Sequence, residues 1–389
     1  MPYIGKKPAD IIATAVDTTT GTFSGDIITV TAGTSNFRAG VNAGNSIASG
    51  GNYNTVVGDE AGTAITTGDQ NTLIGSISGD AITTGTNNSA IGRNSLGSLT
   101  EGQGNTALGT ASLATETTGN YNTAVGISAL QTLNNTGDGY NVAVGADAGK
   151  LVTTGVQNTL IGGLAGDAIT TASNNTALGY TSLTANTTGA LNTALGGQAL
   201  LSNTTASNNT AVGSASLYYN TTGASNTGVG RQALFNNTTA SNNTAVGYQS
   251  LLANTTGTRN TAVGALAGDA NTEGNYNSAF GYNSLGANTT GTHNTALGDY
   301  SQASNTTGIK NVSVGQGSFI TNTSGNNNTV VGTEALQANT TASSNTAVGY
   351  QSLYANTSAS YNSAFGTKAL QANTTGAQNT ALGNDSGQA

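Results

Sequence analysis

The sequence predicts an all-β fold, a parallel β-solenoid of about twenty coils with 17 residues each. The first observation is the motif Asn-(Thr/Ser/Val)-x-apolar-Gly, which recurs every 17 residues from Asn54 to Asn379 with one longer step of 19 between Asn122 and Asn141. The second is that Asn and Gly interrupt every repeat, so no segment is long enough for a stable helix. The third is the β-branched residues between these interruptions, which favour strands.

We number the repeat from its motif Asn as positions 1 to 17. Side chains of a strand alternate between two faces, so positions 2 and 4 share a face. Position 4 is always a large apolar residue, and we therefore expect both positions to point into the coil. Position 9, commonly Leu, supplies the second inward contact. The predicted core residues are Val57, Leu108, Val125, Leu195 and Val246 at position 4, and Leu251 at position 9.

Position 3 then points outward, yet it is mostly Ala. A column of small apolar residues on an outer surface indicates close packing against another chain. We expect this column to form an interface between copies of the chain. The predicted inter-chain residues are Ala177, Ala194, Ala211 and Ala245.

Compensating substitutions support a core at position 9. Where that position becomes Gly, as at Gly62 and Gly79, an aliphatic residue stands three positions later, at Ile65 and Ile82. The Gly at position 5 and the Asn-Thr-Thr-Gly at positions 12 to 15 predict the corners of the coil. Stacked coils are expected to align identical Asn side chains into hydrogen-bonded ladders. The longer repeat predicts a surface loop at residues 134–140, and a degenerate first repeat begins at Asn36.

Composition argues against several classes of function. Only 7% of the residues are charged, there is no Cys, and the single histidine, His293, has no second His or Cys as a partner. We expect no enzyme activity, no cofactor and no metal site. The 9 basic residues are dispersed and no long apolar run occurs, so we expect neither nucleic-acid binding nor membrane insertion.

Tyrosines gather at two positions of the repeat that flank the predicted strand, positions 6 and 17. Exposed aromatic rings are suited to stacking on sugars, although packing between coils or chains is the alternative. The candidate glycan contacts are Tyr180, Tyr248, Tyr282 and Tyr350, all at position 6.

The run Asn192-Thr193-Ala194-Leu195-Gly196 resembles the Asn-Ser-Val-Ala-Ile-Gly repeats in the heads of trimeric autotransporter adhesins. That resemblance implies parallel β-rolls in bundles of three chains. The present repeat is longer than the usual repeat of that family, and we expect no signal peptide, coiled-coil stalk or membrane anchor.

Residues 1–35 are similar to the amino-terminal segments of tailed-phage tail fibres, on the evidence of Tyr3-Ile4-Gly5-Lys6-Lys7-Pro8 and Thr20-Gly21-Thr22-Phe23-Ser24-Gly25-Asp26. This resemblance implies a virion protein, synthesised in the host cytoplasm. Residues 1–35 would attach to a baseplate or tail protein, and residues 36–389 would form the shaft.

We therefore expect a structural tail-fibre shaft that takes part in attachment to a host-surface glycan or protein. Because nothing in the last repeat resembles a cap, we expect either that a tip protein covers the carboxyl end or that a downstream assembly domain was removed during maturation. One alternative is a bacterial adhesin or filament subunit at the cell surface. A further alternative is an ice-binding solenoid, suggested by the Thr columns at positions 13 and 14.

Overall fold

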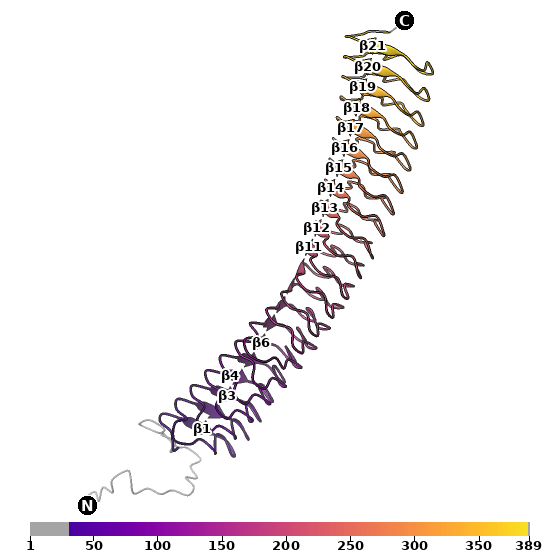
Figure 1. Cartoon of the computed structure of the whole chain (residues 1–389). Coiled ribbons are helices and arrows are strands. Elements are labelled where there is room, and N and C mark those ends of the chain that lie inside the picture. Colours follow the sequence, from indigo (N-terminus) through magenta and orange to yellow (C-terminus); the bar gives the residue numbers. More distant parts are fainter. Residues whose placement is uncertain (1–30, 388–389) are drawn as a thin grey trace, which may run out of the picture.

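The computed structural model describes residues 31–387. The fold is one continuous stack of short parallel strands. The described residues include no helix, and so none that could cross a membrane. The chain climbs coil by coil from one end to the other and forms a gently curved rod (Figure 1). The predicted all-β parallel solenoid is confirmed.

Each coil contributes one strand of three residues, at positions 2 to 4 of the repeat. The 21 strands form one sheet. Their bounds are β1 Phe37–Ala39, β2 Thr55–Val57, β3 Thr72–Ile74, β4 Ser89–Ile91, β5 Thr106–Leu108, β6 Thr123–Val125, β7 Val142–Val144, β8 Thr159–Ile161, β9 Thr176–Leu178, β10 Thr193–Leu195, β11 Thr210–Val212, β12 Thr227–Val229, β13 Thr244–Val246, β14 Thr261–Val263, β15 Ser278–Phe280, β16 Thr295–Leu297, β17 Val312–Val314, β18 Thr329–Val331, β19 Thr346–Val348, β20 Ser363–Phe365 and β21 Thr380–Leu382.

Successive strands pair in strict register, so equal positions of the repeat lie side by side. In β10 and β11, for example, Thr193 pairs with Thr210 and Ala194 with Ala211. The degenerate repeat at Asn36 is confirmed as a coil, because β1 pairs with β2 in the same manner. At a strand spacing of about 4.8 Å, the stack is about 95 Å long.

Hydrogen bonds tie neighbouring coils together around the whole circumference, not only along the strands. At position 13, the Thr83 N–H and the Thr83 hydroxyl both donate to the carbonyl of Thr100 in the next coil, at 2.9 and 3.2 Å. At position 9, the Leu113 N–H donates to the carbonyl of Ala129 at 3.1 Å. Each coil is therefore hydrogen-bonded to its neighbours on several sides. This is expected for a repeat protein, because a single coil is not stable without its neighbours.

The predicted asparagine ladder at position 1 is confirmed. These side chains are buried in nearly every coil, and each Oδ1 accepts the backbone N–H of the corresponding Asn in the next coil. Asn209 shows the pattern, since its N–H donates to Asn192 Oδ1 at 3.0 Å and its Nδ2 donates to the Gly223 carbonyl at 3.0 Å. The ladder thus satisfies buried backbone groups at the corner before each strand.

Three positions of the coil hold non-glycine residues in the left-handed region, namely positions 7, 9 and 17, as at Gln198, Leu200 and Asn208. Position 5 requires glycine, because its φ is near +135° and a Cβ there would collide with the next coil. At Gly196 that Cβ would lie 2.7 Å from the carbonyl carbon of Gly213. The prediction that position 5 is a glycine corner is confirmed.

The inward and outward faces of the strand are the reverse of the prediction. The middle residue of each strand from β2 to β21 is buried, and the residues on either side of it are not. Ala177, Ala194, Ala211 and Ala245 are all 0% exposed within a single chain. They belong to the chain's own core and not to an inter-chain interface.

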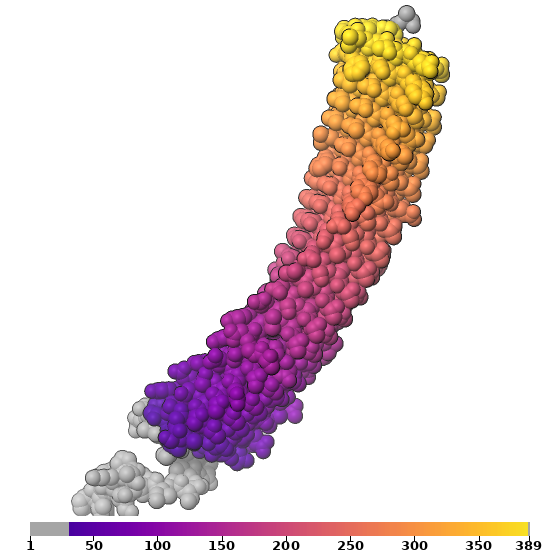
Figure 2. Space-filling view, viewed as in Figure 1, coloured from indigo at the N-terminus to yellow at the C-terminus, as the bar shows by residue number. Residues whose placement is uncertain are grey.

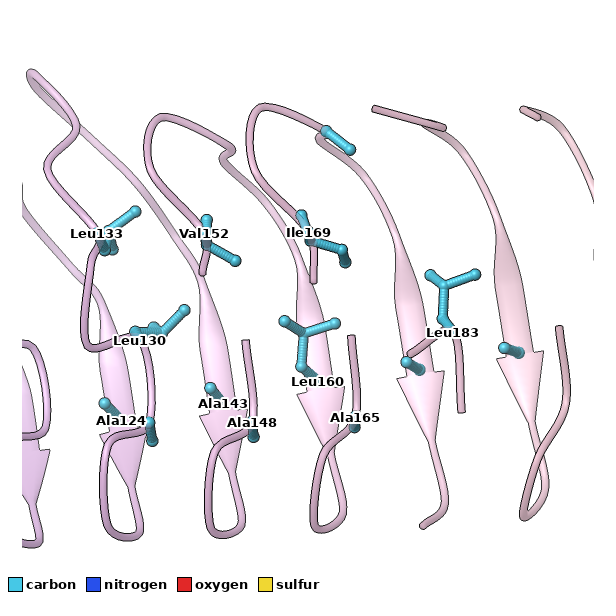
Figure 3. Close-up of a cluster of buried hydrophobic side chains, with 14 of the residues drawn as sticks. Ala124, Leu130, Leu133, Ala143, Ala148, Val152, Leu160, Ala165, Ile169 and Leu183 are labelled. Carbon is cyan, nitrogen blue, oxygen red and sulfur yellow. The ribbon is translucent and has the colours of Figure 1, made fainter. Parts of the chain in front are cut away.

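The coil is too narrow to place a large residue at position 3 in most repeats. The strand faces the returning segment closely, so Ala at position 3 packs against Leu at position 9. Figure 3 shows this arrangement, with Ala124 and Ala143 on their strands and Leu130 on the return segment, all directed into the coil. Leu251, predicted as core, is buried at 2% exposed and that prediction is confirmed.

The predicted core residues at position 4 instead lie on the outer face. Leu108 is 43% exposed, and Val57, Val125, Leu195 and Val246 are each half-buried. The prediction that they form the core is wrong, because alternation along the strand turns position 4 away from the buried position 3.

Candidate functional site

The outer face of the sheet is the most distinctive surface of the described chain. It carries Thr, Ser or Val at position 2 and a large apolar residue at position 4 of every coil from β2 to β21. We call the position-4 residues the outer apolar row, and none of them is buried. The row consists of Val57, Ile74, Ile91, Leu108, Val125, Val144, Ile161, Leu178, Leu195, Val212, Val229, Val246, Val263, Phe280, Leu297, Val314, Val331, Val348, Phe365 and Leu382.

The row follows from the register of the sheet. Because equal positions pair, as Leu195 pairs with Val212, the apolar side chains form one unbroken line along the rod. Several members expose a large fraction of their surface to solvent, including Leu178 at 47% and Leu297 at 48%. Isolated exposed aliphatics are ordinary on protein surfaces, but a contiguous line of them marks an interaction surface.

The candidate glycan contacts are exposed but do not form a platform. Tyr180, Tyr248, Tyr282 and Tyr350 are between 43% and 64% exposed. They share one edge of the sheet, yet coils without tyrosine at position 6 separate them. The guanidinium of Arg231 lies 5.8 Å from the centre of the Tyr248 ring. Glycan contact by these tyrosines remains a prediction.

Position 17, on the other edge of the strand, holds rings in consecutive coils. Tyr276 stacks on His293 with ring centres 4.8 Å apart, and Arg259 lies over the opposite side of Tyr276 at 5.2 Å. The histidine is therefore part of a surface stack between coils. A second stack joins Tyr121 and Tyr140.

A further aromatic cluster was missed by the sequence reasoning. Tyr218, Tyr219 and Phe235 contact one another with ring centres 4.6 to 5.2 Å apart, at positions 10 and 11 of two neighbouring coils. The signal was present in the sequence, because position 10 is large and apolar in four consecutive repeats, from Leu201 to Leu252. These rings pack against one another along the side of the rod.

Burial raises the pKa of Asp269 in the carboxyl-terminal half of the rod, and it has the same effect on two acids of the amino-terminal half, Glu116 and Asp80. Glu116 is fully buried at position 12, and burial raises the pKa of its carboxyl although four backbone N–H groups donate to it. Burial likewise raises the pKa of Asp80, whose Oδ1 is buried without a hydrogen-bond partner. Neither lies in a cluster: residues 31–387 bring together no group of three metal-ligating side chains and contain no pocket.

Comparison with models of protein families gave no match, and comparison with curated protein sequences gave none either. The functional argument therefore rests on the geometry of the rod and of its outer face.

Proposed function

We propose that the chain is the shaft of a homotrimeric fibre, a structural protein and not an enzyme, and that it belongs to the tail fibre of a tailed phage that attaches to its host. The observation that carries this proposal is the outer apolar row. It runs along the whole rod and is left exposed by a single chain.

The size of the row suits association between copies. A contact about 95 Å long and about 10 Å wide would bury roughly 900 Å² on each chain, similar to the roughly 800 Å² per partner of a standard stable interface. Identical chains that each offer one apolar face form a closed bundle when these faces meet at a shared axis. The number three comes from the resemblance to the heads of trimeric autotransporter adhesins.

The continuous shape of the rod supports a shaft. In the space-filling view the described chain is an unbranched, gently curved cylinder from its first coil to its last (Figure 2). The similarity of residues 1–35 to tail-fibre amino termini supports attachment to a tail or baseplate protein. Residues 1–30 lie outside the described part of the chain, so this attachment remains a prediction.

A bacterial surface adhesin or filament would use the same apolar row, and the location of the protein in purified phage particles or on bacterial cells separates the two. The ice-binding alternative depends on the Thr columns at positions 13 and 14. The position-13 hydroxyls donate to carbonyls of the next coil, as Thr221 Oγ1 does to Thr238, which leaves them less suited to binding ice. The alternative as a whole remains a prediction. The tip protein expected at the carboxyl end also remains a prediction.

The experiment is sedimentation equilibrium of the full chain and of a triple variant in which Val229, Val246 and Val263 are replaced by Glu. We expect a trimer for the natural chain and a folded monomer for the variant, because glutamates on the outer face would repel one another at the shared axis. The matched control replaces Thr222, Thr239 and Thr256 by Glu, since the same position natively holds Glu101 and Glu273. A natural chain that sediments as a monomer, or a variant that stays trimeric, would contradict the proposal.

A further inference from the structure

The longest coil of the described rod carries a protruding loop. The step from Asn122 to Asn141 spans 19 residues, and the extra residues lie in the predicted loop at 134–140. Thr136, Gly137 and Asp138 are exposed. The loop folds back on the preceding coil, because the Asn120 N–H donates to the Gly137 carbonyl at 2.8 Å. Loops that depart from a rigid repeat commonly carry function.

A buried carboxylate supports this loop from inside the coil. Glu116 occupies position 12, where other coils hold an aliphatic residue or Asn, and its side chain is 0% exposed. Its Oε1 accepts from the N–H groups of Thr117 and Gly119 at 2.9 and 2.7 Å, and its Oε2 accepts from the Asn135 N–H at 3.2 Å. Burying a carboxylate is costly even when it is hydrogen-bonded. Here the hydrogen bonds from Gly119 and Asn135 to this carboxyl group fix the base of the loop relative to the coil beneath it.

Two tyrosine rings stand beside the loop in consecutive coils. Tyr121 and Tyr140 stack with ring centres 5.5 Å apart and an angle of 8° between their planes. Tyr121 is 41% exposed and Tyr140 is 53% exposed. Gly104 leaves room for the Tyr121 ring, because a Cβ at residue 104 would lie 2.7 Å from its Cδ1. Gly104 is the glycine that this arrangement requires.

Polar groups of three coils converge on the same spot. The Tyr140 hydroxyl donates to Asp138 Oδ2 at 3.0 Å, and Asn120 Nδ2 donates to Asp138 Oδ1 at 3.1 Å. Gln103 Nε2 donates to the Tyr121 hydroxyl at 3.3 Å. An exposed carboxylate held by two partners keeps lone pairs that can accept further hydrogen bonds. The ring stack and the carboxylate are thus presented together on the surface.

We propose that the loop at 134–140, with Tyr121, Asp138 and Tyr140, is a binding site for a neutral saccharide. The apolar C–H face of a sugar ring packs on an aromatic ring, and adjacent sugar hydroxyls donate to a carboxylate in charge-assisted bonds. Residues 105–140 contain no Lys or Arg, and Asp138 is acidic, so the site disfavours anionic sugars. The inference rests on the proposed function of host attachment and places one saccharide contact at a single point along the shaft, where neighbouring coils meet.

The test is binding of the labelled full chain to an array of neutral, amino and sialylated glycans. We expect binding to neutral glycans, weakened at least tenfold by Asp138→Asn and by Tyr140→Leu. The control is Tyr361→Leu, which removes an exposed tyrosine at the same position of a regular coil and is expected to leave binding unchanged. Far-UV circular dichroism checks that the variants keep their β-structure.

The site is overturned if the natural chain binds no neutral glycan, if it binds only sialylated glycans, or if both loop variants bind as strongly as the natural chain. Sedimentation of the same samples separates this result from the fibre proposal. A trimer that binds no neutral glycan contradicts the site alone, and a monomer whose glycan binding depends on Asp138 contradicts the fibre alone.

Discussion

The two halves of the rod fill the same interior column with opposite chemistry. Position 12 in the amino-terminal coils is aliphatic, and each of these side chains is almost fully buried. Its members are Ile47, Ile65, Ile82, Leu99, Leu133, Val152 and Ile169. From Asn186 to Asn373 the same position is Asn in every coil. Glu116 is the exception in the first half.

The asparagines of the second half form a second ladder of side-chain amides. Asn254 Nδ2 donates to Asn237 Oδ1 at 2.9 Å and to the Gly257 carbonyl at 3.0 Å, and Asn271 Nδ2 donates to Asn254 Oδ1 at 2.9 Å. A buried amide in this column is therefore satisfied by its neighbours above and below. In the first half the column is held by apolar contact, which needs no directed partner.

The residue at position 9 also differs between the halves, with Gly more frequent in the first half and Leu in the second. It adopts a left-handed conformation in both halves, with φ of 54° at Gly79 and 51° at Leu200. Glycine relieves that backbone strain but leaves space, which the aliphatic residue at position 12 fills in the first half. In the second half the Asn side chain at position 12 is held in the hydrogen-bonded ladder and does not fill this space. Position 9 therefore remains Leu in most of these coils. Each interior column is therefore a cooperative unit. An aliphatic residue is stabilised by aliphatic neighbours above and below, and an Asn by Asn neighbours.

The largest effect is expected from placing an amide in the aliphatic column. Replacing Ile82 by Asn would remove buried apolar volume and leave an amide between Ile65 and Leu99, with no ladder partner above or below. We expect a loss of about 3–5 kcal/mol in the free energy of local opening. Native-state hydrogen exchange at residues 65–99 measures it, because solenoid coils open locally. Ile127→Asn, at a side chain 61% exposed, is the control and is expected to change little.

The reciprocal exchange is expected to have a somewhat smaller effect. Replacing Asn254 by Ile would leave the buried Asn237 Oδ1 without its donor and would deprive Asn271 Nδ2 of one acceptor. Asn271 keeps its bond to the Gly274 carbonyl, so the expected loss is about 2–4 kcal/mol. Hydrogen exchange at residues 237–274 gives the value. An unchanged exchange rate would show that the ladder contributes nothing and that the two columns are interchangeable.

A smaller difference in local stability is expected between alanine substitutions at two glycines, Gly79 and Gly268, which share position 9 of the coil. A Cβ at Gly79 would lie 2.8 Å from both Ile82 Cδ1 and Leu73 Cδ2, whereas a Cβ at Gly268 would meet only Leu251, at 3.1 Å. Both substitutions place a Cβ on left-handed backbone, which costs about 1–2 kcal/mol in either coil. Gly79→Ala is therefore expected to cost about 1–3 kcal/mol more by overpacking, and Gly268→Ala little beyond the shared backbone cost. Equal losses in local hydrogen exchange would contradict this account of the filled space.

The smallest effect concerns the pH dependence around Glu116. Burial raises the pKa of this carboxyl above its ordinary value, so the folded coil binds the proton more tightly than the unfolded chain. The resulting contribution to stability is fully present below the unfolded pKa and is lost as the pH rises through the folded pKa. We expect the Gly119 and Asn135 amides to open more readily at pH 7 than at pH 4, after correction for intrinsic exchange. Glu116→Gln should remove this dependence, and a dependence that persists would contradict the assignment.

The sequence was sufficient for the repeat, the parallel stack and the asparagine ladder, because these depend on period and on residues with restricted roles. The prediction of which strand face is buried was wrong. Alternation shows that positions 3 and 4 face opposite ways but not which of them is inside, and the larger residue is not the buried one in this coil. A signal was available, because position 3 enlarges to Val56, Leu73 and Leu160 in three coils where position 9 is Gly, although Ala143 and Ala262 stay small in two others. Two positions that exchange volume share a core.

The candidate site could be predicted only in part. Tyrosines beside the strand and the loop at 134–140 were visible in the sequence, but the stack of Tyr121 on Tyr140 depends on the register across a longer coil. The role of Glu116 was also hidden, because one acidic residue in a column of aliphatic residues and Asn resembles a surface substitution. Its burial follows from the path of the loop, which the residue types alone do not specify.

The most direct test of the central claim is an electron cryomicroscopy reconstruction of the assembled shaft, viewed in cross-section. We expect three solenoids around one axis, with the outer apolar row, including Val229 and Val246, at that axis and the Ala194 column enclosed within each chain. A single isolated solenoid, or a bundle in which the outer apolar row faces solvent, would contradict the account.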